Sequence, residues 1–262
     1  MIRRFSRRHI IGHLVMAVTF LGLVVTGFPQ KFPAAGWAKG VVLIFGGVSR
    51  MRFVHHLLGT IMALQLVYHL LELLWFQWVR RYPATMIPTL QDAQDFLQQI
   101  RYNLGLVSNE PQYERYSWPE KLEYLSLIWG TLLMVATGIM MLYPIRFARF
   151  VPGQIILAAK AAHGGEATLA FLAIITWHSY FVHLKHWNTS MFTGKLPREL
   201  YIEEHPKEFA RMWSGDVTKP AEVTTQKFLT FVAVTTIVVI ACVAFVVWLR
   251  AVPMTLKTVS PY

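Results

Sequence analysis

Residues 160–187, KAAHGGEATLAFLAIITWHSYFVHLKHW, form an apolar stretch with His163 near its start and His178 near its end. These histidines are 15 residues apart, which at about 1.5 Å per residue is roughly 22 Å along a helix, most of a bilayer core. Fifteen steps of about 100° end about 60° past a whole number of turns, so both rings can face one bundle interior. One helix can therefore hold two stacked cofactors.

The overall composition indicates an integral membrane protein. Of 262 residues, 55% are hydrophobic and 14% aromatic, and the mean hydropathy is +0.41, which is more apolar than a water-facing surface tolerates. The single cysteine, Cys242, and the lack of a C-x-x-C-H motif exclude covalent haem attachment, iron–sulfur clusters and disulfides within the chain. A redox cofactor would therefore be held by histidine. Lys and Arg cluster at the ends of apolar segments, so the charge of +11 indicates membrane topology rather than nucleic-acid binding.

Five apolar spans predict an all-α integral membrane fold, a bundle of five transmembrane helices. They cover residues 10–29, 54–76, 122–143, 165–187 and 228–250. The first resembles a signal peptide, but it is long enough to cross a membrane and no small-residue cleavage site follows Pro29. With the N-terminus inside, 16 Lys and Arg lie inside and 9 outside, which favours an inner N-terminus and an outer C-terminus.

The loop between the second and third spans contains a predicted amphipathic helix near 89–106. Thr89 and Asp92 form a capping pair at its start. One helical face carries apolar residues, namely Leu90, Ala93, Phe96, Leu97, Ile100 and Leu104. The helix either lies on the inner membrane surface or packs on protein.

Histidines recur at matched depths in these spans. His55 and His69 lie 14 residues apart on the second span, and His13 lies in the first. The topology places His55 and His163 near the outer face, and His13, His69 and His178 near the inner face. A single histidine in a span can be a hydrogen-bonded packing residue, but several at matched depths favour a function.

Two imidazoles on facing helices are the usual axial ligands of a b-type haem. Glycines near them would let the macrocycle approach the backbone; these are Gly12, Gly22, Gly59, Gly164 and Gly165. Zinc is disfavoured, because two ligands per level with no nearby carboxylate or cysteine cluster do not complete a tetrahedral site.

The remaining histidines are weaker candidates. His9, His183 and His186 lie at helix ends, where an interfacial role is common. His56 points about 100° away from His55, so only one of the two can face a given haem. His205 lies in a polar loop, where solvation is expected.

Several segments together resemble a known family, the di-haem cytochrome b (gamma) subunits of respiratory formate dehydrogenases and nickel–iron hydrogenases. The resemblance extends from about residue 4 to residue 211. Its motifs are RRFSRRHIIGHLVM with a following T-G-F-P, RFVHHLLG, RYSWPEKLEYLSLIWGTLLMVATGIMMLYP, W-H-S-Y, T-G-K and E-E-H-P. The resemblance implies a haem-binding core of helices 1–4 within residues 1–215, and residues 216–262 add a linker and a fifth transmembrane helix.

The resemblance also implies the ligand pairs. His55 would pair with His163 at an outer haem, and His13 with His178 at an inner one. The family spaces the two fourth-helix ligands by 14 residues where this chain has 15, which implies a local bulge or a different tilt. His69 is additional to the pattern; it would replace His13, bind a third haem or line a quinone pocket. Arginines 7, 8, 50 and 52 lie at depths suited to haem propionates, although positive-inside and interfacial roles also explain them.

A quinone site beside the inner haem is a further implication. It would involve His178, His69 or the loop entering the third helix, since a quinone needs hydrogen-bond donors and a proton path near an electron carrier. The loop residues are Tyr116, Ser117, Glu120 and Lys121. The alternative is that these charged residues belong to an interface without a catalytic role.

The expected function is a membrane cytochrome b subunit in the prokaryotic cytoplasmic membrane. It would carry electrons through two b haems, or three, between the quinone pool and an outer-face redox subunit, either an iron–sulfur protein or a multihaem cytochrome c, in a hetero-oligomeric complex. No dehydrogenase site of its own and no nucleic acid are expected. The alternatives are a non-redox membrane anchor or assembly subunit, and a His-lined proton or metal transporter.

Overall fold

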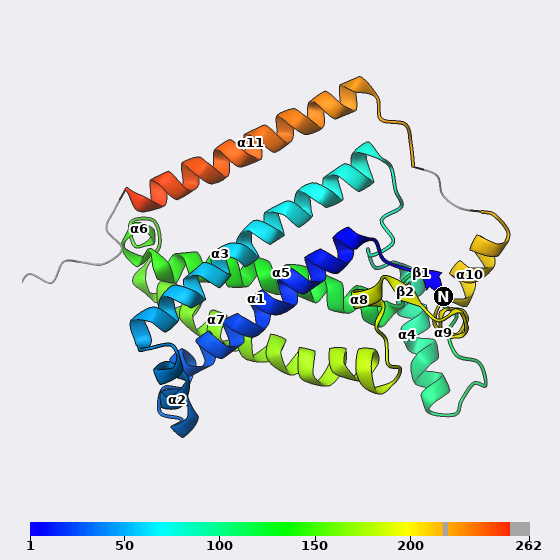
Figure 1. Cartoon of the computed structure of the whole chain (residues 1–262), viewed down its shortest axis with the longest axis horizontal. Helices are drawn as coiled ribbons and strands as arrows, with labels where there is room; N and C mark the ends of the chain where they lie inside the picture. Colours follow the sequence, from blue (N-terminus) through cyan, green and yellow to red (C-terminus); the bar gives the residue numbers. More distant parts are fainter. Residues whose placement is uncertain (217–219, 252–262) are drawn as a thin grey trace, which may run out of the picture. The chain divides into compact units, whose positions relative to one another are not determined.

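The computed structural model describes residues 1–216 and 220–251 (Figure 1). Within these residues, five helices are long and apolar enough to cross a membrane. They are α1 (Arg7–Lys31), α3 (Val48–Leu73) with the π-helix η1 (Leu74–Val79), α5 (Trp118–Leu142), α7 (Gly153–Ala173) with the π-helices η2 (Ile174–His178) and η3 (Tyr180–Leu184), and α11 (Thr225–Arg250). The predicted all-α membrane fold is confirmed.

The fourth span begins twelve residues earlier than the apolar run suggested, at Gly153 rather than 165. The added segment, GQIILAAKAAHG, is rich in alanine, which has the highest helix propensity. Its one charged residue, Lys160, can extend its ammonium group toward water while its methylenes stay apolar. Helix formation therefore continues beyond the segment that hydropathy alone marks.

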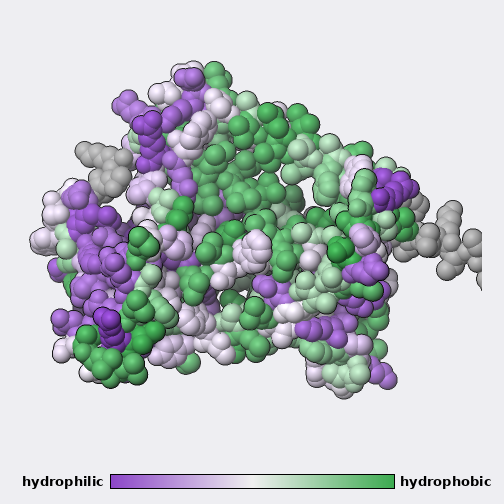
Figure 2. All heavy atoms as spheres, turned by 180° about the vertical axis from the view of Figure 1, so that it is seen from behind, coloured by the Kyte–Doolittle hydropathy of each residue, from purple (hydrophilic) through white to green (hydrophobic). Residues whose placement is uncertain are grey.

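The long helices expose apolar side chains over most of their length. In each apolar window at most 11% of residues are buried by the protein itself, and continuous apolar surface is visible in Figure 2. In water such a surface would be strongly unfavourable, whereas lipid solvates it without cost. Backbone groups in these segments are satisfied within the helices, as a membrane requires.

Two compact units divide the chain. One comprises residues 1–15, 76–129 and 174–222, and the other comprises residues 16–75 and 130–173 with the chain from 223 onward. His13 and His178 belong to the first unit, while His55 and His163 belong to the second. This grouping does not test the predicted division into 1–215 and 216–262, which stays a prediction.

The first unit contains several short elements besides parts of the long helices. They are β1 (Ile2–Arg3), α4 (Leu90–Asn103), α8 (Ser190–Thr193), β2 (Lys195–Leu196), α9 (Arg198–Glu204) and α10 (Pro206–Trp213). Strands β1 and β2 pair in antiparallel register. Beside them the carbonyl of Gly194 accepts bonds from the amides of Arg4 and Phe5. A Cβ on Gly194, whose φ is +73°, would lie 2.9 Å from the Phe5 carbonyl oxygen, so only glycine fits.

Helix α4 confirms the helix predicted in the second loop. The Asp92 carboxylate accepts hydrogen bonds from the amide and the hydroxyl of Thr89, so the predicted capping pair is present. Lys121 at the start of α5 forms an ion pair with Asp92 at 2.7 Å. Burial by itself raises the pKa of Asp92, but the bonds from Lys121 and Thr89 lower it below its ordinary value. Leu90 and Leu104 on the apolar face remain 85% and 68% exposed, as a helix lying on a membrane surface requires; that location stays a prediction.

In the second unit, α2 (Gly36–Ile44) and α6 (Pro144–Phe147) lie in the connections between long helices. The predicted fifth helix, α11, is anchored at both ends by aromatic residues. The Arg146 guanidinium lies over the Trp248 ring and donates to the Trp248 carbonyl. At the other end of α11, Phe231 packs edge-on against Trp75 with ring centres 4.8 Å apart. Most of the helix between these anchors is exposed.

Candidate functional site

His55 on α3 and His163 on α7 face each other in the second unit. Their ring centres are 6.5 Å apart and their planes meet at 65°. An imidazole nitrogen binds a first-row metal at about 2.0–2.1 Å, and two such bonds in line, with about 1.2 Å from each nitrogen to its ring centre, separate the centres by roughly 6.4 Å. The observed spacing therefore fits two axial ligands on one iron. Of the neighbouring His55 and His56, it is His55 that faces His163.

A threonine on an adjacent helix holds each of these rings. Thr26 Oγ1 lies 2.9 Å from His55 Nδ1, and Thr137 Oγ1 lies 2.9 Å from His163 Nδ1. Each threonine hydroxyl also donates to the carbonyl four residues earlier in its own helix, at 2.7 Å and 2.6 Å. Since the single hydroxyl hydrogen is used there, the oxygen accepts from Nδ1–H. Both imidazoles are therefore held with Nε2 unprotonated and able to bind a metal.

A glycine follows each of these threonines and leaves room for the ring. A Cβ on Gly27 would lie 3.1 Å from Cε1 of His55, and one on Gly138 would lie 3.4 Å from Cε1 of His163. A Thr-Gly pair thus supports each histidine: the pair on α1 supports His55, and the pair on α5 supports His163. The two T-G dipeptides, in VVTGFP and VATGIM, were the available signal for these residues, which the sequence reasoning missed.

His13 on α1 and His178 on η2 form a second pair, in the first unit. Their ring centres are 6.3 Å apart and their planes are inclined by only 26°, so this spacing also fits two axial ligands. His178 Nδ1 lies 2.5 Å from Oε1 of Glu123 on α5, whereas His13 Nδ1 is buried without a hydrogen-bond partner in the part of the chain that the structure describes. The sequence reasoning also missed Glu123, although an acidic residue within an apolar span was a signal for it.

The extra residue between His163 and His178 coincides with a change of helix type. Residues Ile174–His178 form a π-helix, which absorbs one residue more per turn than an α-helix. The Ser179 hydroxyl donates to the carbonyl of Ile174, five residues earlier. The predicted local bulge is confirmed.

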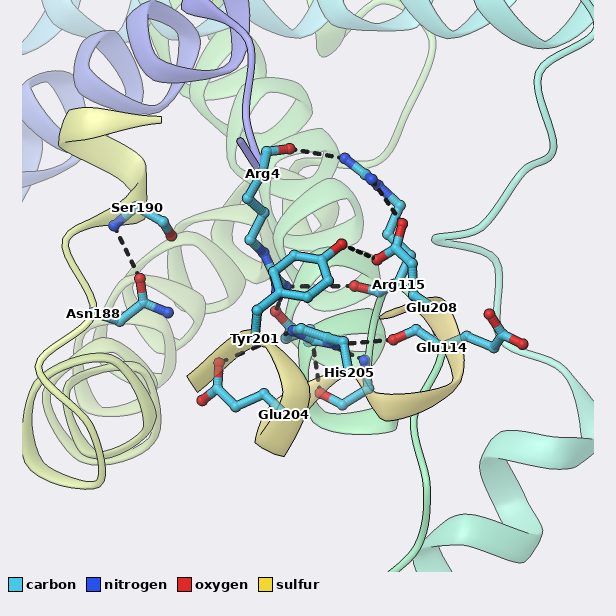
Figure 3. A network of polar contacts seen from close by, with 11 residues as sticks. Arg4, Glu114, Arg115, Asn188, Ser190, Tyr201, Glu204, His205 and Glu208 are labelled. Atoms are coloured by element: carbon cyan, nitrogen blue, oxygen red, sulfur yellow. Dashed lines mark hydrogen bonds and ion pairs between the residues drawn. The ribbon is translucent and has the colours of Figure 1, made fainter. Parts of the chain in front are cut away.

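A buried polar network in the first unit joins the segment before α1 to the start of α5 and to helices α9 and α10 (Figure 3). Arg4, just before α1, forms an ion pair with Glu120 on α5 at 2.6 Å. Arg115 donates to the Arg4 carbonyl and to Glu208 on α10. Glu208 also accepts from the Tyr201 hydroxyl at 2.6 Å, and burial together with Glu208 raises the pKa of Tyr201.

His205 is part of this network and corrects the expectation of a solvated loop histidine. It is only 2% exposed, and its Nδ1 bonds to the Glu114 carbonyl at 2.8 Å. Burial, reinforced by the nearby Arg4 charge, lowers its pKa to about 4. The polar sequence around it did not reveal its burial, because the shielding comes from distant segments.

The predicted quinone residues mostly hold the start of α5. The Glu120 carboxylate accepts from the amide and hydroxyl of Ser117 and pairs with Arg4, while Lys121 pairs with Asp92. The ring of Tyr116 lies beneath the Arg4 and Arg115 guanidinium groups. These contacts establish a structural role; a role toward quinone stays a prediction.

Of the other predicted residues, His69 and Arg8 make the following contacts. His69 Nδ1 lies 3.8 Å from Oε2 of Glu72, one turn further along α3. The guanidinium of Arg8 lies 4.1 Å from the centre of the Phe76 ring. None of these contacts tests the ligand role of His69 or the propionate role of arginines 7, 8, 50 and 52.

The model of the prokaryotic cytochrome b561 family matches residues 4–194, which includes both histidine pairs and both Thr-Gly dipeptides. The chain belongs to the prokaryotic cytochrome b561 family. The family suspected from the sequence motifs is thereby supported, and the cofactor that membership implies is haem b. Among the described residues, no cluster of three or more His, Cys, Asp or Glu side chains could hold a metal ion.

This cytochrome b is also similar to three curated proteins. Each is the cytochrome b556(Fdn) subunit of a nitrate-inducible formate dehydrogenase, from Escherichia coli K12, Escherichia coli O157:H7 and Shigella flexneri. Each is 21% identical over 211 residues, which cover 80% of this chain and 91% of the relative. The alignment therefore spans nearly the whole of each relative.

Proposed function

We propose that this cytochrome b is the membrane subunit of a hetero-oligomeric respiratory oxidoreductase and carries electrons through two b haems between the quinone pool and a redox partner. The observation that carries the proposal is the pair of facing histidines in each compact unit, with ring centres 6.5 Å and 6.3 Å apart. Both spacings match two axial ligands on one iron. The similarity to a formate dehydrogenase subunit supports assembly with further subunits.

His55 and His163 hold one haem in this proposal, and His13 and His178 hold the other. When bound, haem b supplies a one-electron couple within a low-dielectric interior. Thr26 and Thr137 keep the Nδ1 hydrogens of their histidines engaged, which leaves Nε2 of each ring unprotonated and able to bind a haem iron. Gly27 and Gly138 leave space for the rings. The role of the chain is thus to orient ligands and to exclude water.

We assign quinone exchange to the end of the electron-transfer path at the haem that His13 and His178 would hold. Reduction of a quinone takes up protons as well as electrons, so it needs titratable groups close to the electron carrier. Glu120 and Glu123 lie three residues apart on α5, hence on one helix face, and Glu123 contacts His178. Tyr116, Ser117 and Lys121 complete the proposed polar site, while His69 beside Glu72 is the second candidate.

The orientation proposed is an inner N-terminus and an outer C-terminus in a prokaryotic cytoplasmic membrane. It rests on the 16 to 9 distribution of Lys and Arg. The redox partner, an iron–sulfur protein or a multihaem cytochrome c, would then dock at the outer face, near His55 and His163. Residues 1–215 would form the haem-binding part, and α11 would face lipid or a neighbouring subunit.

The test is haem stoichiometry by pyridine haemochrome on the purified chain and on the His69→Ala and His163→Ala variants. Two haems in the wild type and in His69→Ala, with about half the absorbance lost in His163→Ala, are expected. Loss of a haem in His69→Ala would make His69 a ligand and overturn the assignment of His13. A wild-type chain without haem would instead support a non-redox anchor or a transporter, because neither needs a reduced b-type band.

A further inference from the structure

The two histidine pairs differ in what their Nδ1 atoms contact. At the pair formed by His55 and His163 (the 55/163 pair), both Nδ1 atoms contact neutral threonine hydroxyls at 2.9 Å. At the pair formed by His13 and His178 (the 13/178 pair), the partner of His178 Nδ1 is the Glu123 carboxylate at 2.5 Å. His13 Nδ1 has no hydrogen-bond partner among the described residues. The difference is therefore one of charge, because a carboxylate lies beside the 13/178 pair and contacts His178 directly.

A carboxylate acts on a ligand imidazole more strongly than a hydroxyl does. Hydrogen bonds to ionised acceptors are shorter and roughly twice as strong as neutral ones, and a carboxylate that accepts from a ligand histidine raises the basicity of its metal-binding nitrogen. Greater basicity favours the ferric over the ferrous state, because the ferric iron carries one more positive charge. An acidic side chain within an apolar span is costly unless it has such a partner.

We infer that Glu123 is a positioning residue that fixes the orientation of His178 and lowers the reduction potential of the haem at the 13/178 pair. This inference rests on the proposed function and goes beyond it, since it names the residue that makes the two haem sites unequal. Glu123 acts through its contact with His178 and would bias the ferric–ferrous equilibrium of the haem without itself exchanging an electron.

The structure offers a matched comparison between two substitutions. Glu123→Gln keeps the size of the side chain and an oxygen acceptor but removes the charge. Thr137→Val keeps the shape of its side chain and removes the acceptor from His163 at the other pair. If each acceptor acts on its own haem, the two variants shift different steps of the potentiometric titration. The step that each variant shifts then identifies the haem site to which that step belongs.

The experiment is a potentiometric titration of the b-band absorbance of the full chain in native membranes, with haem content measured on the same samples. In Glu123→Gln, one of the two steps should move to higher potential by at least a tenfold change in its ferric–ferrous equilibrium constant, about 59 mV for one electron, while the other stays in place. The ferric low-spin electron paramagnetic resonance signal of the same haem should shift. Thr137→Val should move only the other step.

Three outcomes would contradict the inference. Two unchanged steps in Glu123→Gln, at full haem content, would mean that Glu123 has no influence on potential. A loss of haem with the remaining potentials unchanged would reduce Glu123 to a packing role. A shift of the same step in both variants would show that the two acceptors do not act on separate haems. A wild type without haem would instead defeat the proposed function, so the two failures are distinguishable.

Discussion

Thr26 on α1 accepts a hydrogen bond from Nδ1 of His55 on α3 over 2.9 Å, and its own hydroxyl hydrogen is committed to the Gly22 carbonyl. The direction of the bond is therefore set by the helix backbone rather than by the histidine. A side chain often regarded as a weak helix former here determines which ring nitrogen of His55 is available. The same arrangement recurs at Thr137 and His163.

Substituting valine for Thr26 should weaken haem retention at the 55/163 pair. The change leaves the buried Nδ1–H of His55 without an acceptor, at a cost of about 1–3 kcal/mol, which corresponds to a loss of haem affinity of about 5- to 150-fold. Haem content after dilution in detergent measures this. Thr60→Val is the control, because the Thr60 hydroxyl donates to the His56 carbonyl on an exposed face. Equal haem loss in both variants would contradict the role given to Thr26.

The Gly27→Ala variant should disturb the haem at the 55/163 pair more than the Gly138→Ala variant does. The added Cβ would lie 3.1 Å from His55 in the first variant and 3.4 Å from His163 in the second, and only the first requires the ring to move. Both sites lie in helices, where alanine is favoured over glycine, so backbone propensity does not explain a loss. The ferric electron paramagnetic resonance spectrum and haem content should be altered mainly in Gly27→Ala; the reverse order would refute the steric account.

The Arg115–Glu208 contact should contribute far more to stability than the nearby Arg211–Glu114 contact. Glu208 is 5% exposed and is left with an uncompensated charge in Arg115→Met, which should cost about 3 kcal/mol and lower the apparent Tm by about 6–12 °C in detergent. The side chains of Arg211 and Glu114 lie 3.5 Å apart and are 37% and 53% exposed, so solvent screens the pair and Arg211→Met should change stability by less than about 0.5 kcal/mol. Similar losses in both variants would argue against a buried network.

The stability of the first unit should fall as the pH drops from about 6.5 to about 4, in part because of His205. Its folded-state pKa is about 4, against an ordinary value of 6.5, so the unfolded chain binds a proton more readily in this range. The contribution of neutral His205 is complete above pH 6.5 and is lost progressively toward pH 4, amounting to at most about 3 kcal/mol.

His205→Gln provides the comparison for this pH effect, because glutamine does not titrate and can still donate to the Glu114 carbonyl. Thermal unfolding in detergent between pH 4 and pH 7 should show a shallower pH dependence in the variant than in the wild type. Glu120 and Glu204 lie close to His205 and titrate in both proteins, so the difference between the two profiles reports His205 together with its electrostatic coupling to these carboxylates. Parallel pH profiles would exclude His205 as a source of the acid sensitivity.

The spans and the histidines were predictable from the sequence because both follow from local properties. About twenty apolar residues in succession can satisfy their backbone in lipid only as a helix, and histidines within such spans are conspicuous. The extra residue between the two fourth-helix ligands, recognised from the family resemblance, implied either a local bulge or a different tilt, and the structure has a π-helical turn at Ile174–His178.

By itself, the sequence determined that this protein is a five-helix membrane protein with histidines at matched depths. Only the tertiary structure decided which side chains support the imidazoles of His55, His163 and His178, namely Thr26, Thr137 and Glu123. It also decided that His205 is buried. The physical reason is that these contacts depend on how helices are rotated and spaced against each other. That packing is set by many side chains together, whereas hydropathy and periodicity describe one segment at a time.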